Sequence, residues 1–61
     1  MGFKTAREAA GMAIAEVAEK LGVSRQAIYY WETGEMLPEA VRLPKIAALY
    51  NVTIDELLKE E

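Results

Sequence analysis

The stretch that decides the fold is AEVAEKLGVSRQAIYYWETG, residues 15–34, which predicts two helices joined by a short turn. The first helix is predicted over about residues 13–20, because apolar side chains recur there at the period of an amphipathic helix. The residues of this apolar stripe are Ile14, Val17, Ala18 and Leu21. The second helix is predicted to begin after Ser24, a favourable N-cap, and to run to about Thr33, where Gly34 ends it.

The junction between these helices, Leu21-Gly22-Val23, predicts that they pack as a helix-turn-helix. A short turn containing glycine lets two helices meet at a steep angle. The second can then enter the major groove of DNA while the first braces it across the backbone. This packing needs a small residue where the helices touch, here Ala18, and apolar anchors, here Val23 and Ile28. Trp31 shares the face of Ile28 and is therefore predicted to lie in the core.

The segments on either side also carry helix signals, and none alternates with the two-residue period of a strand. A helix is predicted over about residues 3–10, because Gly11 follows it as a common helix terminator. Residues 34–42 are predicted to form a loop. Pro44 suits the first turn of a fourth helix, which is predicted to run to about Tyr50.

The last residues predict a fifth helix. Asn51 suits the left-handed conformation that ends a helix, and Thr53 and Glu56 have the spacing of a capping box. The fourth and fifth helices are expected to bury apolar side chains in a common core: Leu43, Ile46, Ala47, Tyr50, Ile54, Leu57 and Leu58. The sequence therefore predicts an all-α, compact five-helix fold.

Composition excludes several classes of function. A chain of 61 residues predicts a single domain, residues 1–61, and the absence of cysteine and histidine removes disulfides, thiolate metal sites and the commonest general base. No nucleophile–base pair, metal cluster or phosphate loop is recognisable, so we expect neither an enzyme nor a bound cofactor or metal. No apolar run approaches the roughly 20 residues that span a bilayer, and no signal peptide is recognisable. We therefore expect no membrane association and a cytoplasmic location.

The run AEVAEKLGVSRQAIYYWETGEMLP, residues 15–38, resembles the lambda-repressor-like (Cro/CI-type, XRE) helix-turn-helix family. The segment PKIAALYNVTIDELL, residues 44–58, is similar to the closing two helices of that family. The resemblance implies a helix-turn-helix at about residues 13–33 and sequence-specific binding to double-stranded DNA, usually as a homodimer. It also implies a prokaryotic cell or a phage-infected host as the setting.

Carried over by position, the resemblance implies a set of base-facing residues, namely Arg25, Gln26, Ala27 and Tyr30. It implies phosphate neighbours as well, namely Ser24, Tyr29 and Thr33, to which we add Arg42, a cation near an acidic loop. Arg7 and Glu32 match a pair that forms an ion pair in related proteins. The chemistry agrees, because Arg25 can donate two hydrogen bonds to guanine and Gln26 can pair with adenine.

Two functions remain open at the level of sequence. The first is a transcription regulator, in particular a repressor that binds a palindromic operator through the helix that starts at Ser24. The second is a protein-interaction module, antitoxin-like or anti-repressor, that reuses the fold. Ile14 stands where the family often has a polar phosphate contact, Glu35 and Glu39 make the following loop acidic, and the net charge is −3. These features favour few phosphate contacts or a protein partner.

The C-terminal helix has two interpretations as well. Its apolar residues Ile54, Leu57 and Leu58 are expected to pack into the core, and some of them are expected to form a two-fold dimer interface. In such a dimer the two recognition helices would lie about 34 Å apart and read half-sites one turn apart.

Overall fold

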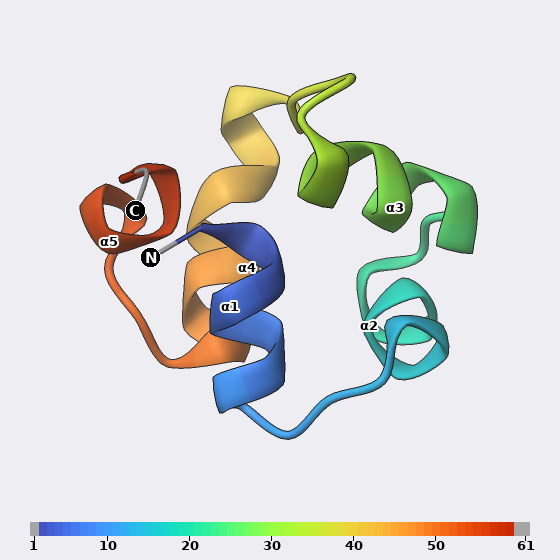
Figure 1. Cartoon of the computed structure of the whole chain (residues 1–61), viewed down its shortest axis with the longest axis horizontal. Helices are drawn as coiled ribbons and strands as arrows, with labels where there is room; N and C mark the ends of the chain where they lie inside the picture. Colours follow the sequence, from blue (N-terminus) through green and yellow to red (C-terminus); the bar gives the residue numbers. More distant parts are fainter. Residues whose placement is uncertain (1, 60–61) are drawn as a thin grey trace.

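The computed structural model describes residues 2–59, and these residues form five α-helices and one short 3-10 helix (Figure 1). No strand occurs among them, so the all-α prediction is confirmed. The elements are α1 Phe3–Ala9, α2 Ile14–Leu21, α3 Arg25–Thr33, η1 Ala40–Arg42, α4 Leu43–Tyr50 and α5 Ile54–Leu58. Each predicted α-helix is present, with bounds within one or two residues of those predicted.

One apolar core holds these helices together. Figure 1 shows α1 against α4, with α5 on one side of this pair and with α2 and α3 on the other. All five helices contribute buried side chains to the core: Phe3, Ala6, Val17, Ala18, Ile28, Trp31, Ile46, Ala47, Tyr50 and Leu57. The prediction that Trp31 belongs to the core is confirmed, since only 8% of it is exposed.

Local signals account for most helix ends. The Ser24 hydroxyl oxygen accepts a hydrogen bond from the amide of Ala27 at 3.1 Å and so caps α3. Thr53 and Glu56 form both bonds of a capping box at the start of α5, each 3.0 Å long. Asn51 has a φ of 59° and ends α4 in the left-handed conformation, as predicted. Pro44 lies in the first turn of α4, where a missing N–H breaks no helical hydrogen bond.

The structure corrects three details. The segment predicted as a loop over residues 34–42 includes the 3-10 helix η1. Leu58 was predicted to be in the core but is 45% exposed, and Leu43 and Ile54, predicted to be buried as well, are only half-buried. Successive residues of an α-helix point about 100° apart, so Leu57, which is fully buried, turns its neighbour Leu58 towards solvent. Among residues 2–59, no helix has the length and apolar character needed to cross a membrane.

Candidate nucleic-acid interface

The turn between α2 and α3 has the geometry of a helix-turn-helix. Gly22 ends α2 with φ 69° and ψ 33°, a left-handed conformation that costs glycine little because it has no Cβ. The amide of Val23 then donates to the carbonyl of Ala18 at 3.0 Å, and Ser24 starts the next helix. Figure 1 shows α2 and α3 together, on the side of the molecule away from α5.

Arg25 and Gln26 occupy the first turn of α3, and both are exposed. Among residues 2–59, neither side chain makes a hydrogen bond or ion pair with another part of the chain. Arg25 offers a forked set of donors and Gln26 offers a donor and an acceptor, which are the groups that base edges recognise. The structure therefore presents both side chains free to bind an external ligand.

The other predicted base contacts are less accessible. Ala27 and Tyr30 are half-buried, because they lie partly towards the body of the protein. Tyr29, predicted to lie near a phosphate, is 57% exposed. Together with Ile14, Ala15, Arg25 and Gln26, Tyr29 lines a shallow hollow of about 370 Å³ between the starts of α2 and α3.

The hydroxyl groups of Ser24 and Thr33, both predicted to lie near phosphates, differ in whether their proton is available to donate a hydrogen bond. The Ser24 oxygen accepts the cap hydrogen bond, which leaves its hydroxyl proton available to donate. The Thr33 hydroxyl instead donates to the carbonyl of Tyr30 at 3.2 Å and accepts from the amide of Glu35 at 3.5 Å. Ser24 is therefore better prepared than Thr33 to donate to a phosphate.

Arg42 is tied to the scaffold. Its Nη1 donates to the carbonyl of Leu21, the last residue of α2, at 3.4 Å, and its Nε lies 3.7 Å from Oε1 of Glu39. The side chain of Arg42 is about one-third exposed and that of Glu39 about three-quarters exposed. The link from η1 to the end of α2 has no sequence signal, because the two segments are 21 residues apart.

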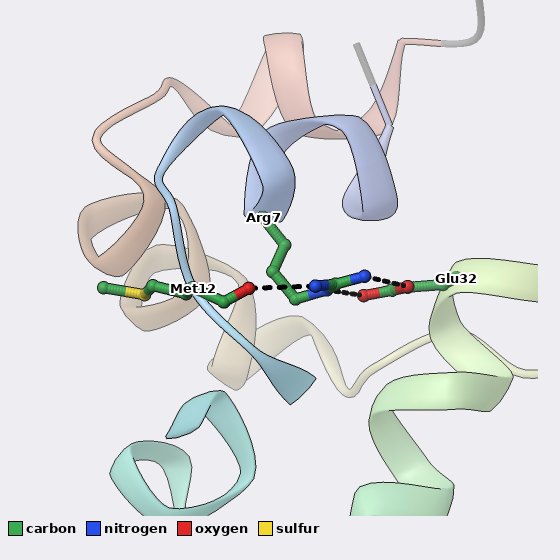
Figure 2. Close-up of polar contacts among 3 residues, drawn as sticks. All are labelled: Arg7, Met12 and Glu32. Carbon is green, nitrogen blue, oxygen red and sulfur yellow. Dashed lines mark hydrogen bonds and ion pairs between the residues drawn. The ribbon is translucent and has the colours of Figure 1, made fainter. Parts of the chain in front are cut away.

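Arg7 and Glu32, the predicted partners, form an ion pair that joins α1 to α3 (Figure 2). Arg7 Nε donates to Glu32 Oε2 at 2.6 Å, Nη2 donates to Oε1 at 3.2 Å, and Nη1 donates to the Met12 carbonyl at 2.9 Å. Only 12% and 5% of the two side chains are exposed. The hydrogen bond to Glu32 raises the pKa of Arg7 above its ordinary value.

This pair also fixes the position of α3. Glu32 lies in the last turn of α3, and Met12 belongs to the connection that leads into α2. One guanidinium therefore holds α1, the entrance to α2 and the end of α3 together. The hydrogen bond to the Met12 carbonyl was not predicted, because almost every residue has the same backbone carbonyl and the sequence does not indicate which one accepts.

Comparisons with known proteins agree with this geometry. A family model described as helix-turn-helix matches residues 3–57. The HTH-type transcriptional activator BcrR of Enterococcus faecalis is 48% identical over 46 residues, which cover 75% of this chain and 22% of that protein. The chain thus spans about a fifth of the length of this curated relative. No solved structure matches the chain at a significant level. The chain belongs to the lambda-repressor-like (XRE) helix-turn-helix family.

Proposed function

We propose that this chain binds a specific sequence of double-stranded DNA through α3 and thereby regulates transcription. The observation that carries the proposal is the state of Arg25 and Gln26, which are exposed and unengaged on a helix whose start is capped by Ser24. The Arg7–Glu32 pair holds the far end of the same helix. A well-oriented contact from Arg25 to guanine or from Gln26 to adenine contributes about 1–3 kcal/mol of discrimination between bases.

Further contacts follow from the same placement of α3. We assign Ala27 and Tyr30 to the base edges, Ala27 as an apolar contact to a thymine methyl group. We assign the phosphate contacts to four residues, Ser24, Tyr29, Thr33 and Arg42. Such contacts set the register of the protein on the duplex, whereas the contacts to bases select the sequence.

The proposed assembly is a homodimer on a palindromic operator. Ile54 is half-buried and Leu58 is 45% exposed on α5, so both offer apolar surface to a second copy. Leu57 is fully buried and would support such an interface from inside the protomer. A dimer of this kind would read two half-sites about 34 Å apart, one turn of the duplex.

The proposed outcome of binding is repression in the cytoplasm of a prokaryotic cell. Occupation of an operator that overlaps a promoter is sufficient to exclude the polymerase, whereas activation needs a further favourable contact with it. The relative BcrR is named an activator, and a promoter fused to a reporter gene distinguishes the two outcomes. Reporter output that rises with expression of this chain would overturn repression and leave DNA binding intact.

Selection of duplexes from a random pool, with the solution mass measured in parallel, tests the proposal. We expect a two-fold symmetric consensus and a dimeric mass. Gln26→Ala should weaken binding to the consensus by about five- to 150-fold, which corresponds to about 1–3 kcal/mol. Thr5→Ala is the control, because Thr5 is exposed and belongs to α1, outside the helix-turn-helix. Equal binding by the Gln26 and Thr5 variants would contradict the proposal.

A second function, a protein-interaction module, has its own supporting observation. Met36 and Leu37 are 58% and 72% exposed, and the acidic residues Glu35 and Glu39 flank them. Exposed apolar residues within an acidic segment suit a protein partner better than a polyanion. Failure to enrich any duplex at low salt, together with loss of a protein complex on Leu37→Ser, would establish this function instead.

A further inference from the structure

The hollow between α2 and α3 combines apolar walls with hydrogen-bonding groups. Ile14 is half-buried against the core, Ala15 is exposed, and Tyr29 is 57% exposed. These three residues supply apolar surface, and Arg25 and Gln26 complete the lining. The two side chains best suited to reading bases thus border the same small space as an isoleucine, an alanine and a tyrosine ring.

We propose that this hollow receives the 5-methyl group of a thymine in the major groove. Ile14 and the ring of Tyr29 are then specificity-determining residues for that base, while the Tyr29 hydroxyl is left for the phosphate contact. The inference rests on the proposed function, because it concerns DNA bound to the same helix. Ile14 has no hydrogen-bond donor or acceptor in its side chain, so whatever it contributes to binding must come from apolar contact.

The chemistry of the major groove points to thymine as the occupant. The 5-methyl group of thymine is the apolar group that unmodified base pairs display there, among hydrogen-bond donors and acceptors. Gln26 pairs best with adenine, whose partner on the opposite strand is thymine. An A·T pair therefore offers a polar edge to Gln26 and a methyl group to the hollow at neighbouring positions of one groove.

The partial exposure of Ile14 and Tyr29, the two walls of the hollow, fits this role. A methyl group that leaves water for an apolar contact contributes a factor of about four in affinity. Ile14 cannot satisfy a phosphate, and the part of this half-buried side chain that still faces solvent gains from being covered. A polar side chain at this position could bond a phosphate, which every DNA sequence provides. Isoleucine loses that contact and instead gains one with a methyl group that only thymine provides.

The test uses the operator recovered by selection and replaces each thymine, one at a time, with deoxyuridine. This replacement removes the methyl group and keeps every hydrogen-bonding atom of the base. We expect a loss of about fourfold in affinity at the thymine of each half-site that meets the hollow, apart from any loss at a thymine that contacts Ala27, and no change at thymines outside the footprint of α3.

Protein variants then identify the residues that contact the methyl group. With Ile14→Ala, the uridine replacement should cost less than twofold, because the wall that contacts the methyl group is missing. Tyr29→Ser provides a second test that does not disturb the core, since Tyr29 is largely exposed. Val41→Ala is the control, because Val41 is an apolar residue of η1, 74% exposed and outside the hollow. This variant should retain the fourfold loss, and melting temperatures report whether each variant is folded.

The outcomes separate this inference from the proposed function. Specific operator binding that is indifferent to uridine at every position overturns the thymine contact and leaves the proposed function standing. A requirement for 5-methylcytosine at that position overturns it as well. If no duplex is enriched, both the thymine contact and the proposed function are overturned. Loss of a protein complex on Tyr29→Ser would then assign the hollow to a protein partner.

Discussion

At the scale of single residues, the Arg7–Glu32 pair shows how one ion pair can fix the position of a helix, here α3. The Glu32 carboxylate is only 5% exposed, and Arg7 supplies two of the donors that face it. A charge in such a place is stable only while its partner is present, because water cannot replace the lost interactions. The pair therefore stabilises the fold chiefly by preventing an uncompensated charge.

We expect Arg7→Ala to lower the free energy of unfolding by about 3–5 kcal/mol, since the substitution leaves the Glu32 carboxylate unpaired. Urea denaturation followed by circular dichroism measures the change. Lys4→Ala is the matched control, because Lys4 is an exposed cation of the same helix, and its effect should stay within about 0.5 kcal/mol. An unchanged denaturation midpoint for Arg7→Ala would show that the pair does not stabilise the fold.

Tyr50 predicts a sensitivity to alkaline pH. Burial raises the pKa of its hydroxyl from 10.0 to about 12, the nearby Glu32 adds to the rise, and Arg7 opposes it. The unfolded chain therefore loses this proton at a lower pH than the folded chain does. The stabilising contribution is complete below pH 10 and is lost as pH rises from about 10 to about 12.

Denaturation midpoints of the wild type and of Tyr50→Phe test this expectation when they are measured from about pH 8, below the window, to about pH 11.5, near its upper end. The wild type should lose about 1–3 kcal/mol more stability across that range than the phenylalanine variant, because each pKa unit corresponds to about 1.4 kcal/mol. Parallel curves for the two proteins would exclude Tyr50 as the source of alkaline instability.

At the scale of the helices, three of the starts have nearly the same backbone but different side chains. The φ and ψ values are −76° and 157° at Ser24, −82° and 160° at Thr53, and −81° and 155° at Ala13. Ser24 and Thr53 accept a hydrogen bond from an amide in the first turn, whereas Ala13 has no side-chain acceptor. The start of α2 thus has the conformation of a capped helix without the cap.

Ala13→Ser should therefore stabilise the protein by about 1 kcal/mol, because the backbone already places a serine oxygen in capping position. Thermal denaturation measures this gain. Ala15→Ser provides the control, since Ala15 is also exposed but lies inside α2, where serine has lower helix propensity than alanine. A destabilising Ala13→Ser would mean that the start of α2 changes conformation.

At the scale of the whole molecule, charge limits how the protein can bind DNA. The net charge is −3, and Arg25 is the one cation within α3. Arg42, a second candidate, is held by the Leu21 carbonyl and by Glu39. Few cations are therefore available to neutralise phosphates, so affinity for DNA must depend more on contacts to bases. Because each neutralised phosphate adds to the salt dependence of binding, that dependence should be shallow.

We expect the logarithm of operator affinity to fall with the logarithm of salt concentration at a slope no steeper than about −4 per protomer. Glu35→Lys should make the slope steeper by about 1, because it places a cation in the loop that follows α3. Glu8→Lys changes the net charge by the same amount at an exposed position of α1 and should leave the slope unchanged. Equal slopes for the two variants would show that the loop does not approach the phosphates.

Much of the architecture was predictable from the sequence, because helix signals are local. Apolar periodicity, the caps at Ser24 and Thr53 and the left-handed positions Gly22 and Asn51 act within four or five residues of the chain. A window of that size therefore contains the information that sets each helix. The pairing of Arg7 with Glu32 was expected from the resemblance to the family, since nothing local connects residues 25 positions apart.

The tertiary structure alone decided which functional groups are free. It engaged the Thr33 hydroxyl, tied Arg42 to the end of α2, turned Leu58 to the surface and joined Ile14 and Tyr29 in one hollow. Each of these outcomes depends on the angle at which packed helices meet or on the position of a backbone carbonyl. Many side chains set those positions jointly, so the sequence determined the helices while the packing between them determined the binding surface.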